Sequence, residues 1–226
     1  MFICGTSHAF EFLNTPLPPA SLSWQCDDPV LSSSFERMFA VWNSVIDNRF
    51  TITKVDKGAD VIVSYSSIGA DFGQTEIHLI NQQEFYYDKL NISRSISPIL
   101  FSDHVMLHEI GHVLGMNHSE DTGAIMYAEA QNITTSLTLD DIIGICTLYG
   151  VAPPSTVHAH IKWKRTGFRK YAFSLPGFYP LVLNWSFGDG SADSILTPVH
   201  KYKRKGMVAV SVSFGLFHDT AFVMVK

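Results

Sequence analysis

Two hydrophobic periodicities run through the first 150 residues. Hydrophobic side chains recur at steps of three and four residues after the serines at 32–34, which predicts an amphipathic helix with these serines as N-caps. Two more helices are expected at about 102–114 and 138–148. β-Branched runs at 59–65 and 76–80 predict strands. This region is therefore expected to be a mixed α+β domain. The hydrophobic positions of the first helix are Phe35, Met38, Phe39, Trp42, Val45 and Ile46.

Proline-containing segments suggest where this region begins and ends. Residues 151–155 contain two prolines and have the composition of a linker. Beyond them only short alternating stretches remain, as at 207–214, and these predict a small β-sandwich. The prolines in residues 14–19 predict an extended segment near the amino end. We therefore divide the chain into an N-terminal arm (1–21), an α+β domain (22–150), a linker (151–155) and an all-β domain (156–226).

The charge distribution supports this division. Residues 1–150 contain 6 Lys and Arg against 18 Asp and Glu, whereas residues 151–226 contain 10 against 3, so a net charge of −12 is followed by +7. Opposite charges indicate two domains with different surroundings. The basic residues form short clusters in a strand-like region, so we expect no nucleic-acid partner. Because no apolar run approaches the ~18 residues of a membrane span, we expect no transmembrane segment.

The most specific motif is H-E-x-x-H-x-x-G-x-x-H at residues 108–118. Four residues apart on a helix, His108 and His112 share one face and can both bind one Zn²⁺ at ~2.1 Å. Gly115 can adopt the positive φ that ends a helix, so that His118 returns as the third ligand. Three imidazoles leave the fourth zinc position open to water, which is the arrangement of a catalytic site.

Glu109 follows the first ligand and is the candidate general base. Zinc lowers the pKa of its bound water towards ~7, while Glu109 takes the proton and later delivers it to the leaving amine. The pattern thus predicts a zinc-dependent endopeptidase. His104 lies four residues before His108, but three histidines at this spacing spread over roughly 12 Å along a helix, too far for one ion. We interpret His104 as a residue that packs against the site or supports it.

Residues 22–150 resemble the matrixin (matrix metalloproteinase) branch of the metzincin zinc peptidases. The resemblance covers residues 22–24, the helix at 40–45, the strand at 59–63, the zinc motif and a closing helix at 139–150. Met126, eight residues after His118, is similar to the methionine of the family's Met-turn, which forms a hydrophobic floor under the metal. The resemblance implies a twisted mixed sheet with three helices and a secreted metalloendopeptidase that binds an extended peptide along an edge strand.

Two carboxylates in the closing helix are candidates for supporting the metal site or for binding the N-terminus. Asp140 and Asp141 lie in its first turn, where the helix dipole favours negative charge. One of them is expected to hold the Met-turn by hydrogen bonds, and the sequence does not decide which. Cys26 and Cys146 either pair or stay free.

The sequence also departs from the matrixin pattern. The segment between Tyr65 and Gln74 is shorter than its matrixin equivalent, which carries structural zinc and calcium sites, and only His78 resembles one of those ligands. Calcium is a candidate cation that cannot be placed. Cys4 lies 20 residues before Trp24, a spacing similar to the family's cysteine switch, in which a thiolate fills the fourth zinc position. The flanking Arg and Asp of that switch are missing, so Cys4 is either a latency ligand or a mobile terminal cysteine.

Residues 156–226 resemble a PKD domain, an immunoglobulin-like β-sandwich. The resemblance rests on W-x-F-G-D-G at 185–190, H-x-Y at 200–202 and the strand after Gly206, where Val208 replaces the usual Tyr. It implies a spacer or a binder of protein or polysaccharide. The basic charge can hold the chain on an anionic matrix or polysaccharide, dock on the acidic domain, or be a solvated face. An alternative for the whole chain is a zinc-binding adhesion protein with little proteolytic activity.

Overall fold

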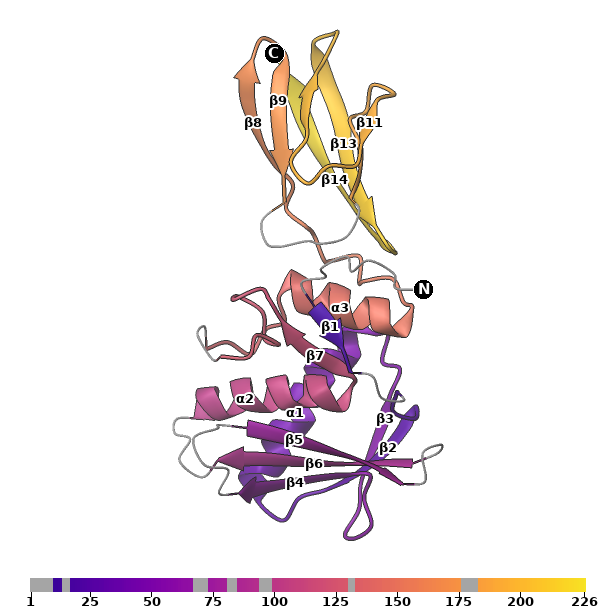
Figure 1. Ribbon diagram of the computed structural model, residues 1–226, viewed down its shortest axis with the longest axis vertical. Coiled ribbons are helices and arrows are strands. Elements are labelled where there is room, and N and C mark those ends of the chain that lie inside the picture. Colours follow the sequence, from indigo (N-terminus) through magenta and orange to yellow (C-terminus); the bar gives the residue numbers. More distant parts are fainter. Residues whose placement is uncertain are drawn as a thin grey trace, which may run out of the picture. The chain divides into compact units, whose positions relative to one another are not determined.

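The computed structural model describes residues 10–13, 17–66, 73–80, 85–93, 99–129, 133–175 and 183–226. They form two compact units, the first spanning Phe10–Tyr149 and the second Gly150–Lys226 (Figure 1). Within these described segments, no helix combines the length and apolar character that crossing a bilayer requires.

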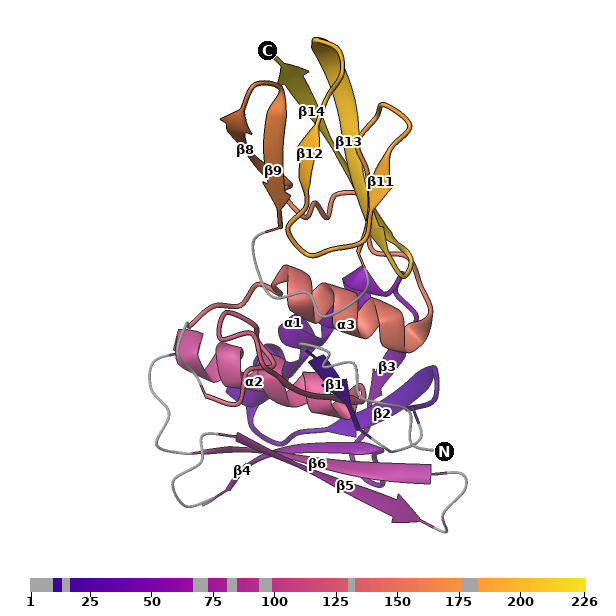
Figure 2. The same cartoon turned by 45° about the horizontal axis from the view of Figure 1, so that its top comes forward.

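The first unit is built on a five-stranded mixed sheet. Its strand order is β3-β2-β4-β6-β5, in which β5 alone runs antiparallel to its neighbour. Helices α1 (Pro29–Val45) and α2 (Ile99–Val113) lie on the same side of this sheet (Figures 1 and 2). A third helix, α3, spans Leu139–Tyr149. The predicted α+β architecture with three helices is confirmed. The strands are β2 (Ser21–Gln25), β3 (Thr51–Lys54), β4 (Val61–Ser66), β5 (Gly73–Ile80) and β6 (Phe85–Ser93).

Most predicted elements of the first unit lie where the periodicity placed them. The strands expected at 59–65 and 76–80 are β4 and β5, and the helix expected at 138–148 is α3. The second helix begins three residues earlier than predicted, at Ile99. A short antiparallel pair, β1 (Phe10–Phe12) with β7 (Met116–Ser119), was not predicted.

The predicted start of α1 was wrong. The helix is capped by Asp28, whose carboxylate accepts hydrogen bonds from the backbone N–H groups of Val30 (2.9 Å) and Leu31 (3.0 Å). Asp is as good an N-cap as Ser, and the proline that follows it suits the first helical position. Ser32 and Ser34 instead lie inside the helix and are buried.

A run of aromatic rings forms the core of the first unit. The indole N–H of the fully buried Trp42 donates to the carbonyl of Leu107 at 2.8 Å, which fastens α1 to α2 just before His108. Consecutive ring centroids lie 4.7–6.1 Å apart, a range typical of favourable aromatic packing. The run comprises Trp24, Phe35, Phe39, Phe50 and Tyr149. Cys26 and Cys146 are both buried and free, which settles their pairing.

The second unit contains two antiparallel sheets, with strand orders β11-β10-β13-β14 and β12-β9-β8. Phe173 of β9 packs against Trp185 of β10 (ring centroids 6.1 Å apart) and against Phe187 (5.5 Å), so a core joins the two sheets. Tyr202 is also buried. The strands are β8 (Lys162–Gly167), β9 (Lys170–Ser174), β10 (Asn184–Ser186), β11 (Ala192–Asp193), β12 (Val199–Lys201), β13 (Gly206–Phe214) and β14 (Phe217–Val225).

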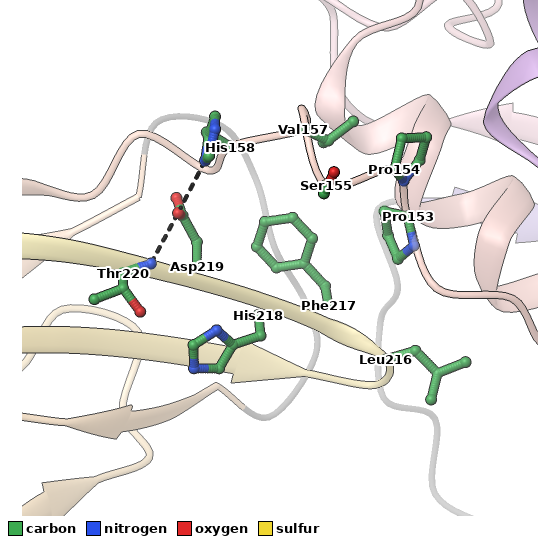
Figure 3. A pocket seen from close by; sticks show the side chains of 10 residues that line it. All are labelled: Pro153, Pro154, Ser155, Val157, His158, Leu216, Phe217, His218, Asp219 and Thr220. Carbon is green, nitrogen blue, oxygen red and sulfur yellow. Dashed lines mark hydrogen bonds and ion pairs between the residues drawn. The ribbon is translucent and has the colours of Figure 1, made fainter.

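The chain enters this unit beside a pocket of about 340 Å³ (Figure 3). Asp219 of β14 is buried and accepts hydrogen bonds from the backbone N–H of Ala159 (2.8 Å) and of Thr220 (2.8 Å). Its carboxylate also lies 3.2 Å from Nδ1 of His158. Asp219 therefore holds the segment that enters the unit, at His158 and Ala159, against β14. The pocket is lined by Pro153, Pro154, Ser155, Val157, His158, Leu216, Phe217, His218, Asp219 and Thr220.

Candidate metal centre

The structure brings the three predicted metal ligands together. Ring nitrogens of His108, His112 and His118 all lie within 4.8 Å of one another, and the Nε2 atoms of His108 and His112 are 3.1 Å apart. The first two residues lie on α2 and the third on β7. His104 is not part of this cluster.

The end of α2 turns the chain so that His118 can reach the other two histidines. Gly115 has a φ of +94°, the left-handed conformation that glycine adopts without strain, and its N–H donates to the carbonyl of His112 at 2.9 Å. The carbonyl of Gly115 accepts a hydrogen bond from the N–H of Leu13 (2.9 Å), and β7 then pairs with β1. The strand that carries His118 is thus held by the N-terminal strand.

Backbone carbonyls orient two of the imidazoles. Nδ1 of His108 lies 2.7 Å from the carbonyl oxygen of Ile125, and Nδ1 of His112 lies 2.9 Å from that of Met116. A carbonyl oxygen can only accept, so each Nδ1 carries the hydrogen and each Nε2 keeps its lone pair. Burial, and secondly the neighbouring His112, lower the pKa of His108 to about 3; burial lowers that of His112 to about 4. Both rings are neutral at pH 7, and this donor set fits Zn²⁺.

Glu109 and His104 are both buried on α2. Glu109 is 4% exposed and directly follows the first ligand in the chain. His104 is 5% exposed, and its Nδ1 lies 2.9 Å from the carbonyl oxygen of Thr134. His104 therefore anchors the segment that precedes α3, in keeping with the packing role expected of it.

Met126 packs beneath α2 in a space that exists because residue 111 is glycine. Met126 is fully buried. A Cβ built at Gly111 would overlap the sulfur of Met126 and lie only 3.0 Å from the Trp42 ring. Gly111 was not among the residues predicted from the sequence. The sequence feature that could have identified it is a glycine in the middle of a predicted helix, between two predicted ligands. At such a position alanine stabilises a helix by about 1 kcal/mol more than glycine.

The two carboxylates of α3 support different segments of the site. Asp141 accepts hydrogen bonds from the backbone N–H groups of Ile125 (2.9 Å) and Met126 (3.0 Å), so Asp141 is the one that holds the turn containing Met126. It also accepts from the N–H and hydroxyl of Thr138, both at 2.8 Å. Asp140 accepts from the hydroxyl of Ser119 at 2.7 Å, next to His118.

Burial raises the pKa of both carboxyl groups. Desolvation raises the pKa of Asp140 to about 7, although the Ser119 hydroxyl opposes the shift. It also raises the pKa of Asp141, against the opposing effect of four hydrogen bonds. The helix dipole was expected to favour negative charge at these positions, whereas desolvation disfavours the charged form of a buried carboxyl.

Comparison with known proteins agrees with this geometry. Residues 73–150 match the matrixin family, the M10 peptidases. The first unit is therefore similar to a matrixin catalytic domain over these residues. Its histidine triad is of the kind that binds catalytic zinc in matrixins.

Named relatives include two plant enzymes. Metalloendoproteinase 1 of Glycine max is 29% identical over 145 residues, covering 56% of this chain and 48% of the relative. Metalloendoproteinase 4-MMP of Arabidopsis thaliana is 30% identical over 146 residues, covering 55% and 42%. The chain thus spans less than half the length of these relatives. A solved structure of myroilysin aligns with a TM-score of 0.46 and 15% identity, covering 61% of this chain and 97% of myroilysin.

Two predicted features lie outside what the structure describes. Cys4 precedes the described residues, so its role as a latency ligand stays a prediction. The backbone of His78 belongs to β5, but its side chain is not described, and a structural zinc or calcium site therefore stays a prediction as well.

Proposed function

We propose that this chain is a zinc-dependent endopeptidase that hydrolyses peptide bonds of protein substrates. The observation that carries the proposal is the convergence of three histidines, of which His108 and His112 are neutral at pH 7, in a segment that also contains the buried Glu109. Three nitrogen ligands leave one coordination position for the reaction, which distinguishes a catalytic zinc site from a structural one.

In this proposal the residues around the metal have separate roles. Zinc, when bound, supplies Lewis acidity to the scissile carbonyl and lowers the pKa of coordinated water. Glu109 accepts the proton of the attacking water and donates it to the leaving amine. Ile125 and Met116 hold the His108 and His112 rings through their carbonyl groups, while Met126 forms the apolar floor.

The substrate is proposed to bind as an extended strand along β5. This strand lies at one edge of the five-stranded sheet and contacts α2, the helix that carries His108 and His112. A peptide that adds to a sheet edge gains affinity from main-chain hydrogen bonds, and pockets for its side chains then provide specificity.

The second unit is proposed to be a PKD-like, immunoglobulin-like sandwich that spaces the peptidase or binds an anionic matrix. Its two antiparallel sheets, the buried Trp185, Phe187 and Tyr202, and its basic composition support this role. The resemblance to matrixins supports a secreted location.

Cys4 is proposed as a latency ligand. The pairing of β1 with β7 supports this, because Phe10 follows Cys4 by six residues and lies opposite Ser119, next to His118. The test is Cys4→Ser, which should raise the peptidase activity of freshly purified protein; unchanged activity would remove this role.

The central test is hydrolysis of casein or gelatin by zinc-loaded protein. We expect a chelator to abolish cleavage, added zinc to restore it, and Glu109→Gln to lower the rate by about 10²–10⁴-fold while zinc content is unchanged. Wild-type activity in Glu109→Gln would contradict the role of that residue. A zinc-loaded wild type that cleaves nothing would instead favour the adhesion protein.

A further inference from the structure

Among the described residues of the second unit, one face of the sheet β12-β9-β8 carries only lysines as charged groups. Tyr171 and Phe173 of β9 point into the core, so Lys170, Ala172 and Ser174 point outward, because side chains alternate along a strand. Residues directly opposite one another in neighbouring strands share a face. The outward neighbours are therefore Lys162 (opposite Ser174), Lys164 and Val199 (both opposite Ala172), and Lys201 (opposite Lys170).

Four exposed lysines thus form an array, which we call the lysine face: Lys162, Lys164, Lys170 and Lys201. With ~3.4 Å per residue along a strand and ~4.8 Å between strands, their Cα atoms span about 14 Å by about 10 Å. Three neighbouring strands hold this array, so its spacing is set by the sheet. Figure 2 shows the hairpin of β8 and β9 beside β12.

Within the described residues of 151–226, no ion pair joins an acidic group to these lysines. The three acidic residues of 151–226 already bind other groups: Asp189 binds His200, Asp193 the backbone N–H of Ser194, and Asp219 that of Ala159. Lys170 and Lys201 lie directly opposite each other, and like charges in such a pair destabilise the sheet. An anion bound between them would relieve this repulsion and stabilise the fold.

We propose that the lysine face binds a sulfated polysaccharide. This proposal deepens the accessory role given to the second unit under the proposed function. A linear chain with a permanent charge on successive sugars can meet several of the four ammonium groups at once. Ala172 and the half-exposed Val199 between the lysines offer the sugar rings a flat apolar strip.

The same face is poorly suited to nucleic acid. Single strands are bound by stacking their bases on aromatic side chains, and none of the outward residues of this face is aromatic. Trp163 lies on the other side of β8, opposite Phe173. The nearby Phe168 belongs to the β8–β9 turn, and the Arg169 guanidinium lies 4.6 Å from its ring centroid.

Titration of the full chain with heparin tests the proposal. We expect heparin to bind and to raise the melting temperature, whereas fully desulfated heparin and oligo-dT of equal length should bind at least about tenfold more weakly. In Lys162→Gln/Lys164→Gln/Lys170→Gln/Lys201→Gln, heparin affinity at 0.15 M salt should fall at least about tenfold. The slope of log K against log salt should also shrink by about three to four, since each lost contact removes about one.

A matched control removes the same charge from the same unit but outside the lysine face: Lys203→Gln/Arg204→Gln/Lys205→Gln/Lys226→Gln. It should keep most of the affinity and of the salt slope. An equal loss in both variants would mean that net charge alone governs binding, and oligo-dT binding as tight as heparin would indicate a nucleic-acid surface. Either result, or no heparin binding by the wild type, overturns the proposal.

Two further measurements keep the outcome unambiguous. If the fourfold variant does not fold, the double variants Lys162→Gln/Lys164→Gln and Lys170→Gln/Lys201→Gln should each lose about half of the salt slope. Casein hydrolysis is measured on the same preparations. Heparin binding without hydrolysis would count against the peptidase assignment alone, and hydrolysis without heparin binding against the lysine face alone.

Discussion

Asp141 and His108 are connected through a single residue. The Asp141 carboxylate accepts the backbone N–H of Ile125, and the carbonyl of Ile125 lies 2.7 Å from Nδ1 of His108. A buried carboxyl group of α3 thereby fixes the peptide that orients a metal ligand on α2. Residues that orient metal ligands in this way contribute to metal affinity without touching the ion.

Replacing Asp141 by Asn should weaken both stability and zinc binding. An amide has one accepting oxygen, so its NH₂ group would face backbone N–H donors that Asp141 now satisfies. We expect a loss of about 2–3 kcal/mol in the free energy of unfolding and about a 10–100-fold loss of zinc affinity. Urea unfolding and competition with a zinc chelator measure the two effects.

Asp140→Asn is the matched control. The Asp140 carboxylate accepts from the Ser119 hydroxyl, which can accept as well as donate, so an amide can replace the carboxyl with a smaller loss. Equal effects of the two substitutions on zinc affinity would contradict the link between Asp141 and His108.

Asp140 should also make stability depend on pH. Its pKa in the folded state is about 7, against 3.8 for the ordinary group, so between these values the folded state binds more protons than the unfolded state. This residue therefore lowers stability as pH rises from about 4 to 7. Asp140→Asn removes the effect. The unfolding free energy of the variant, relative to that of the wild type, should therefore rise between about pH 4 and 7 and stay constant above pH 7. Unfolding free energies at pH 5, 6, 7 and 8 give the comparison, and a difference that is constant or shrinks with pH contradicts the assignment.

Gly111→Ala should destabilise the first unit, even though alanine is the better helix former. A methyl group there would displace Met126 and press on Trp42, and overpacking of this kind typically costs about 1–3 kcal/mol. Urea unfolding measures the change. In Gly123→Ala the new methyl would meet only the flexible side chain of Asp121, at 3.3 Å, so this control should stay within about 0.5 kcal/mol of the wild type. A neutral or stabilising Gly111→Ala would refute the close packing of Met126.

Asp219→Ala should destabilise the second unit. It leaves the buried N–H of Ala159 without its acceptor, an effect of about 1–3 kcal/mol. Differential scanning calorimetry should show a lower melting transition for this unit. The control Asp193→Ala removes only local bonds to the next two residues and should change the transition much less. Equal shifts would mean that Asp219 does not anchor the entering segment.

Local spacing was enough to predict that the three histidines meet. These three predicted ligands and Glu109 lie within eleven consecutive residues, so helix geometry and one glycine turn determine how they meet. The prediction of helix α3 depended in the same way on neighbouring residues alone. Features that depend on contacts between distant residues were not predictable. β1 pairs with a strand about a hundred residues away. Only the placement of α3 decides that Asp141 binds Ile125 while Asp140 binds Ser119.

The prediction of where α1 starts was wrong for a different reason. The chain offers Asp28 and three serines as N-caps of similar strength, and periodicity alone does not rank them. Burial of Ser32 and Ser34 decided the choice, because these side chains bind Lys54 and Asp103 inside the fold.

The most direct test of the account is a crystal structure of the zinc-loaded protein with anomalous diffraction measured on both sides of the zinc absorption edge. We expect one strong zinc peak about 2.1 Å from a ring nitrogen of each of His108, His112 and His118. A peak elsewhere, or imidazole rings that point away from one another around no ion, would contradict the account.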